Sequence, residues 1–139
     1  MSLYLIDTNI LSELMRPQPC APVCDFVAQL DTAYISTITV HELEYGIARL
    51  RDAQRQERLR EGMAHWMELY ADCILDVSTA IAQTAAQMRA QVQRHGRMLH
   101  LADALLSATA KEHGLRLATR NIADLHGLGV ALFNPWDDA

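Results

Sequence analysis

The sequence predicts an α/β fold in which a short, mostly parallel sheet of four or five strands is covered by helices. Short apolar runs, typical of buried strands, alternate with longer segments whose apolar residues recur at helical spacing. Half of the 139 residues are hydrophobic, which is enough for the core of an ordinary domain, and no repeat or low-complexity tract interrupts the chain. We therefore expect one domain that spans residues 1–139.

The expected strands are short and mostly apolar. The first is followed by Asp7-Thr8-Asn9, as expected of a buried parallel strand that leads into a loop. The second is β-branched and aromatic and ends near Ser36. In chain order, the predicted strands cover residues 3–6, 33–36, 73–77, 115–119 and 130–133.

The expected helices are identified by their apolar spacing and by the residues at their ends. Ser78 or Thr79 suits the cap of one helix, and Gly114 suits the end of another. Thr39 and Glu42 have the spacing of a capping box. The predicted helices cover residues 10–15, 22–30, 40–50, 53–69, 79–94 and 101–113.

Acidic residues from distant parts of the chain are expected at one edge of this sheet. Asp7 follows the first strand, Glu42 lies in the helix after the second, and Asp124 lies just past the fourth. Ligands of open parallel sheets bind beyond the carboxyl ends of the strands. The order of elements therefore predicts that these acids converge.

Each acid also has a purely structural interpretation. Asp7 could cap the next helix, and Glu42 could complete the capping box with Thr39. Asp103 lies in the first turn of a predicted helix, where the helix dipole favours an acid, and Asp124 could be an ordinary turn residue. The joint appearance of the acids favours a functional role.

The chemistry that suits such a cluster is metal-assisted hydrolysis of a phosphodiester. Clustered carboxylates repel one another and are costly without a cation. Mg²⁺ and Mn²⁺ prefer oxygen ligands, and two such ions about 4 Å apart can activate a water and neutralise charge on the phosphate. An acidic cluster without a basic partner nearby in sequence therefore supports a metal-site hypothesis.

The charge of the chain argues against broad, non-specific binding to duplex DNA. The net charge is −5, from 12 basic and 17 acidic residues, whereas such binding needs many cationic contacts to phosphate. Five arginines nevertheless fall in one short stretch, which is either a solvated helix face or an edge that contacts phosphate. They are Arg49, Arg51, Arg55, Arg58 and Arg60.

The sequence predicts a cytoplasmic protein that does not associate with a membrane. No stretch approaches the roughly 18 apolar residues that a membrane span needs, and no basic segment precedes the first apolar run. Three cysteines are too few for a disulfide framework. Cys20 and Cys24 could form half of a zinc site, but no second pair has matching spacing.

Four motifs and the tail of the chain carry a resemblance that covers nearly its whole length. The motifs are LIDTNIL at 5–11, ISTITVHELEYG at 35–46, DALLSATA at 103–110 and LATRNIAD at 117–124, followed by FNPW at 133–136. In this order and at this spacing they resemble the PIN-domain family, and within it the VapC-like toxin ribonucleases and the related FitB-like proteins. The resemblance implies a three-layer α/β/α fold.

The resemblance also implies which residues act. It implies RNA cleavage with one or two Mg²⁺ or Mn²⁺ ions, and Arg49 or Arg51 could guide the RNA backbone. His100 could face the site as a proton donor, or be an ordinary surface or core histidine. The catalytic and metal-binding set carried over from the family is Asp7, Glu42, Asp103 and Asp124, and the supporting residues are Thr8, Asn9, Thr119 and Asn121.

The resemblance further implies an RNA substrate, a cognate antitoxin that blocks the site, a homodimer, and contact with operator DNA only through the antitoxin. One alternative is a binding subunit of an operator-bound regulatory complex with little or no nuclease activity. An aspartyl-phosphate phosphatase would usually need a second Asp where Asn9 stands. A receiver domain would need a phosphate-facing Lys late in the sheet, whereas Lys111 lies in a predicted helix.

Overall fold

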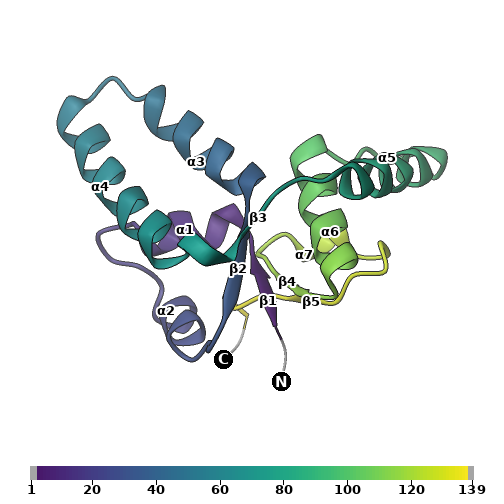
Figure 1. Ribbon diagram of the computed structural model, residues 1–139, viewed down its shortest axis with the longest axis horizontal. Helices are drawn as coiled ribbons and strands as arrows, with labels where there is room; N and C mark the ends of the chain where they lie inside the picture. The colour runs from purple at the N-terminus through teal and green to yellow at the C-terminus, as the bar shows by residue number, and fades with distance from the viewer. Residues whose placement is uncertain (1–2, 138–139) are drawn as a thin grey trace.

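The computed structural model describes residues 3–137 and contains a five-stranded sheet between two groups of helices (Figure 1). The strand order is β3-β2-β1-β4-β5, and all four strand pairs are parallel. The α/β prediction with five strands is therefore confirmed. The strands are β1 (Tyr4–Ile6), β2 (Ala33–Ser36), β3 (Ile74–Leu75), β4 (Arg116–Ala118) and β5 (Leu132–Phe133).

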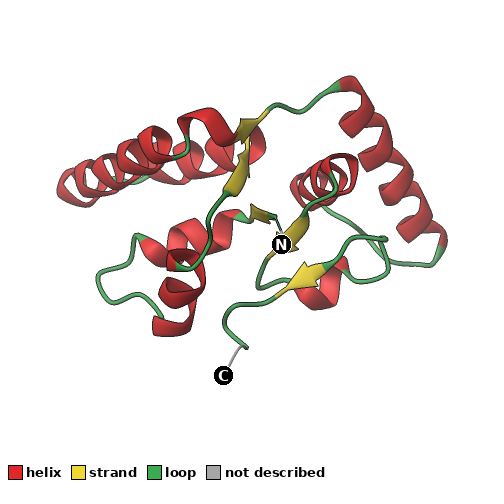
Figure 2. Ribbon diagram, turned by 60° about the horizontal axis from the view of Figure 1, so that its bottom comes forward, coloured by secondary structure: helices red, strands yellow, loops and turns green. Residues whose placement is uncertain are grey.

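The helices lie on both faces of the sheet, as Figures 1 and 2 show from two directions. Helices α1 to α4 occupy one side, and α5 to α7 occupy the other, so the expected three-layer arrangement is confirmed. The helices are α1 (Thr8–Leu14), α2 (Ala21–Ala28), α3 (Thr37–Ala48), α4 (Ala53–Leu69), α5 (Thr79–Arg94), α6 (Leu101–His113) and α7 (Ile122–Leu125), with a 3₁₀ turn η1 (Ala71–Cys73) before β3.

The central strand β1 joins the two cores of the molecule. Its side chains alternate between the faces of the sheet, as the pleat of a strand requires. Leu5 packs into the core formed with α5 and α6, whereas Tyr4 and Ile6 pack into the core formed with α1 to α4. Burial on both faces fixes the register of β1 and therefore the place where the chain leaves the sheet.

Most predicted elements are present with small shifts of their ends. The predicted helix 101–113 and the Ser78 cap are confirmed; the Ser78 hydroxyl accepts a bond from the Ile81 N–H at 3.1 Å. Gly114 ends α6 in the left-handed conformation with φ 66°. The third strand is only two residues long, and α7 was not predicted.

The predicted start of the third helix is wrong. The helix begins at Thr37, and its cap is Ser36, whose hydroxyl accepts a bond from the Ile38 N–H at 3.0 Å. Thr39 therefore lies inside the first turn, where its side chain is fully buried, and the capping box with Glu42 does not form. Both side chains are used in long-range contacts near the carboxyl end of the sheet instead.

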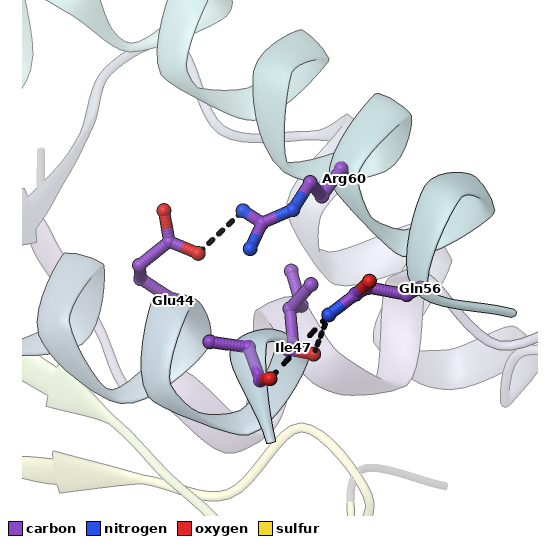
Figure 3. Close-up of polar contacts among 5 residues, drawn as sticks. Glu44, Ile47, Gln56 and Arg60 are labelled. Atoms are coloured by element: carbon purple, nitrogen blue, oxygen red, sulfur yellow. Dashed lines mark hydrogen bonds and ion pairs between the residues drawn. The ribbon is translucent and has the colours of Figure 1, made fainter. Parts of the chain in front are cut away.

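Helices α3 and α4 are held together by polar contacts on their outer side (Figure 3). Arg60 on α4 forms an ion pair with Glu44 on α3. The Gln56 side-chain amide donates to the Ile47 carbonyl at 3.1 Å, which satisfies a carbonyl at the end of α3. These contacts join α4 to α3, the helix that follows β2.

In the part of the chain that the structure describes, no helix is both long enough and apolar enough to cross a membrane.

Candidate active site

Asp7 lies at the centre of the carboxyl edge of the sheet. It follows β1 directly, and its N–H donates to the Ala118 carbonyl at the end of β4 at 3.0 Å. From β1 the chain builds the sheet outward on one side through β2 and β3, and it then crosses to the other side of β1 to form β4 and β5. Such a switch point is where open α/β sheets bind ligands.

The Asp7 carboxyl is buried, with 5% of its surface exposed. Its Oδ2 accepts a bond from the Thr119 hydroxyl at 2.6 Å and one from the Asn9 amide at 3.3 Å. Burial raises the pKa of Asp7 from 3.8 to about 6, opposed by the Thr119 bond and reinforced by the charges of Asp103 and Glu42. The carboxyl is therefore held in an environment that disfavours its charge unless a cation is near.

Glu42 is brought to the same edge by α3, the helix that follows β2. Its Oε1 accepts a bond from the Thr8 hydroxyl at 2.6 Å, and the Thr8 and Thr39 hydroxyls are 3.1 Å apart. These bonds join the helix after β1 to the helix after β2. The buried Thr39 therefore positions Glu42 through Thr8.

Asp103 comes from the first turn of α6, on the other side of the sheet. Partial burial raises its pKa, the charges of Glu42 and Asp124 raise it further, and His100 acts in the opposite direction. Asp124 lies in the first turn of α7 and is exposed. His100 occupies the cap position of α6 and is also exposed.

One cavity of about 740 Å³ brings three of the four predicted acids together. Asp7, Glu42 and Asp103 all line it, although Asp7 follows β1 and the other two lie in α3 and α6. Asp124 and His100 are not among its lining residues, and Asp124 is linked to the cluster only through its charge on Asp103. Three of the four predicted acids therefore share one cavity, and Asp124 is not part of its lining.

The donor set suits a hard divalent cation. Carboxylate and amide oxygens are the ligands that Mg²⁺ and Mn²⁺ prefer. Within residues 3–137, Asn9 Oδ1 is buried without a hydrogen-bond partner, beside the Asp7 carboxylate that its amide nitrogen contacts. In the same part of the chain, no three His, Cys, Asp or Glu side chains are already close enough together to hold a metal ion. Mg²⁺ is usually bound through one or two carboxylates and several waters, so the acids need not all contact an ion directly.

The predicted supporting residues all lie near the acids. Thr119, which is fully buried, donates to Asp7 and accepts the Asn121 N–H at 3.0 Å. Thr8, Asn9 and Asn121 line the cavity. Of the two arginines singled out for RNA, Arg49 lines the cavity, and Arg51 is not among its lining residues.

Several lining residues were not predicted. Glu13 is buried on α1, accepts the Cys20 N–H at 2.9 Å and forms an ion pair with Arg16, and these contacts lower its pKa. Arg120 and Trp136 lie in the fourth motif and the tail, the only sequence signal that could have identified them. The residues missed are Glu13, Arg16, Arg120 and Trp136.

Comparison with known proteins identifies the family of this chain. The PIN-domain family model matches residues 4–123. Toxin FitB of Neisseria gonorrhoeae is 37% identical over 139 residues, which is 98% of this chain and all of that protein. VapC ribonuclease Y4jK of Sinorhizobium fredii is 32% identical over 143 residues, covering 99% of this chain and all of that protein.

A solved structure has the same fold over almost the whole chain. The structure of FitAB bound to an IR36 DNA fragment superposes with a TM-score of 0.87 and 36% identity, covering 96% of this chain and 95% of that one. The sequence resemblance is therefore confirmed by a family model, by relatives and by a superposed structure. The chain belongs to the PIN-domain family, with FitB-like and VapC-like proteins among its relatives.

Proposed function

We propose that this protein is a metal-dependent endoribonuclease and the toxin of a type II toxin–antitoxin pair. One observation carries the proposal: the acids Asp7, Glu42 and Asp103, from three separate elements, line one cavity at the switch point of the sheet. The relatives named toxin and ribonuclease support the same assignment.

Asp7, Glu42 and Asp103 would hold one or two Mg²⁺ or Mn²⁺ ions, with Asp124 contributing from the margin of the site. When bound, the metal supplies an activated water and neutralises charge on the phosphate under attack. Asn9 Oδ1 is a further oxygen in position to take part, because it is buried beside Asp7 and has no partner within residues 3–137.

Hydroxyl groups around the acids hold two of them in place. The Thr119 hydroxyl donates to Asp7 Oδ2, and the Thr8 hydroxyl donates to Glu42 Oε1, both at 2.6 Å. A hydroxyl that donates to a carboxylate stabilises the charged form, so the Thr119 bond opposes the effect of burial on Asp7. Both bonds also restrict the rotamers of two ligands before a metal or RNA binds.

The proposed partners follow from the relatives. The FitAB structure contains DNA, and by analogy we propose a cognate antitoxin that covers this cavity and provides the contact with operator DNA. The net charge of −5 suits a subunit that leaves DNA binding to its partner. We also propose that the chain forms a homodimer.

The proposal is tested by incubating partner-free protein with labelled structured and unstructured RNAs in Mg²⁺, Mn²⁺ or a chelator. We expect cleavage that requires metal and is lost in Asp7→Asn. Cleavage that persists with the chelator, or that Asp7→Asn retains, would contradict the assignment. Binding of an antitoxin and operator DNA without cleavage of any RNA would favour a regulatory binding subunit.

A further inference from the structure

The main cavity contains a concentration of arginines. Five of the twelve basic residues of this acidic chain line it, three of them from the arginine-rich stretch at 49–60. Arg60, from the same stretch, pairs instead with Glu44 on the outer side of α4 (Figure 3). The cavity arginines are Arg16, Arg49, Arg55, Arg58 and Arg120.

Among these, Arg120 is stacked on an aromatic side chain. Its guanidinium lies 4.8 Å from the centroid of the Trp136 ring, and both side chains line the cavity. The Arg120 side chain is exposed, and within residues 3–137 it forms no ion pair, although its charge acts on Glu13, the partner of Arg16. Stacking on the indole orients the guanidinium and leaves its N–H donors available at the edges of its plane.

The sheet fixes where this pair lies relative to the acids. Parallel pairing aligns Ala118 of β4 with Phe133 of β5, and the Thr119 N–H donates to the Phe133 carbonyl at 2.9 Å. The residues that follow these strands, Arg120 and Trp136, are therefore brought together at the carboxyl edge. Arg120 is also the immediate neighbour of Thr119, which holds Asp7, so the arginine is placed on the β4 side of the buried acid.

Arg49 is supported in a similar way on the other side of Asp7. It follows α3, the helix after β2, and its guanidinium lies 5.6 Å from the Tyr45 ring centroid. Because β1 lies between β2 and β4, the elements that lead to Arg49 and Arg120 lie on opposite sides of Asp7, and both arginines line the cavity. This arrangement suits a ligand whose anionic groups recur along a chain that crosses the site.

A phosphate backbone fits this arrangement better than an acidic peptide does. Guanidinium groups bind phosphate through paired N–H donors. An acidic peptide that reached Arg120 would bring its carboxylates into the cavity that Asp7, Glu42 and Asp103 also line. An RNA strand instead places one phosphate at the acids and the next within reach of the flanking arginines.

We propose that Arg120, held by Trp136, is a positioning residue that binds an RNA backbone phosphate adjacent to the one that is cleaved. The inference rests on the proposed ribonuclease function and identifies the part of the substrate that this flank of the cavity holds. Arg120 fixes the register of the strand over Asp7, and Trp136 reduces the conformational freedom that the arginine would otherwise lose on binding.

The test measures binding and cleavage separately. Binding of a short single-stranded RNA is followed by fluorescence anisotropy over a series of salt concentrations, in an Asp7→Asn background that does not cleave. Arg120→Ala, Arg120→Lys and Trp136→Leu are compared with Arg94→Ala, which removes an exposed arginine from the end of α5, outside the cavity. Cleavage kinetics are measured for the same four changes with Asp7 intact, and thermal unfolding checks that each variant folds.

We expect Arg120→Ala to raise Kd about tenfold and to reduce the slope of log K against log salt by about 0.7, the contribution of one single-strand phosphate. In the cleavage assay, Arg120→Ala should raise KM by a larger factor than it lowers kcat. Arg120→Lys and Trp136→Leu should retain the slope, because the charge remains, and should raise Kd severalfold. Arg94→Ala should change neither quantity.

The failure of this inference is distinguishable from failure of the proposed function. If the wild type cleaves RNA and Arg120→Ala leaves both the salt slope and KM unchanged, Arg120 does not contact phosphate and the inference is overturned. It is also overturned if Arg120→Ala weakens only the binding of a partner protein. If the wild type neither binds nor cleaves RNA, both the proposed function and the inference fail.

Discussion

Asp7→Asn should stabilise the metal-free protein above pH 6, although it removes the central residue of the site. The pKa of Asp7 is raised from 3.8 to about 6 by burial, so the folded protein resists ionisation of this group. A rise of about two pH units, at about 1.4 kcal/mol per unit, corresponds to about 3 kcal/mol of lost stability once the group is charged. An asparagine does not ionise, but its buried NH₂ needs an acceptor, which lowers the expected gain to about 1–3 kcal/mol.

The raised pKa also predicts how the stability difference between the two proteins changes with pH. Because the folded pKa is the higher one, Asp7 contributes its full stability below about pH 4 and loses it as pH rises through about 6. The advantage of asparagine should therefore be absent at low pH, grow between about pH 4 and 6, and stay constant above. Adding Mn²⁺ should reverse the order, because an ion that binds only the wild-type fold stabilises it.

The assay is urea unfolding of the wild type and Asp7→Asn over this pH range, first with a chelator and then with Mn²⁺. Asp31→Asn is the matched control, since Asp31 is exposed. A difference in unfolding free energy that does not change with pH would refute the reasoning. So would an asparagine variant that is less stable than the wild type at pH 8 in the chelator.

Three further substitutions test the support of the site and of the sheet. Thr119→Val should remove the 2.6 Å bond to Asp7, raise the pKa of that carboxyl further and lower kcat at neutral pH. Thr119→Ser keeps a hydroxyl and should retain most activity. The readout is the pH–rate profile, which should shift in Thr119→Val and not in Thr119→Ser. Leu5→Ala, at a fully buried position of β1, should cost about 2–5 kcal/mol in urea unfolding, and a cost under about 1 kcal/mol would mean that this core is not packed as described. Arg60→Ala should cost under about 1 kcal/mol, because the pair with Glu44 is exposed, and should leave RNA cleavage unchanged.

Much of the fold was predictable because its strongest patterns are local. The apolar run of β1 and the helical spacing of α6 each have one strong interpretation, and both elements lie where the sequence placed them. Helix α7 was missed because four residues are too few to show a period. The predicted strand at 73–77 is longer than β3, because the apolar residues on either side of β3 also pack against the core.

The error at α3 shows where local patterns mislead. Thr39 and Glu42 have capping-box spacing, but Glu42 accepts its bond from Thr8, 34 residues away in the sequence. A three-dimensional contact thus replaced the local one, and Ser36 provided the cap. The residues that form the contact were both singled out from the sequence, whereas their pairing depends on the adjacency of β1 and β2.

The acidic centre was largely predictable, but the arginines around it were not. The topological argument placed Asp7, Glu42 and Asp124 at one edge, and the family motifs added Asp103; Asp7, Glu42 and Asp103 line the same cavity. Asp124 was treated as an equal member, yet it is exposed and does not line the cavity. The contact of the Arg120 guanidinium with the Trp136 ring depends on the pairing of β4 with β5. No spacing in the sequence specifies this pairing.

The central claim is that Asp7, Glu42 and Asp103 together hold the divalent cation on which RNA cleavage depends. Its most direct test is the single-turnover rate of RNA cleavage by partner-free protein as a function of Mn²⁺ concentration, for the wild type, Glu42→Gln, Asp103→Asn and Asp124→Asn. We expect a saturable dependence for the wild type, a rate at least about 100-fold lower for the first two variants, and a smaller loss for Asp124→Asn. Wild-type rates for Glu42→Gln or Asp103→Asn at the same Mn²⁺ concentrations, or a wild-type rate that does not depend on Mn²⁺, would contradict the claim.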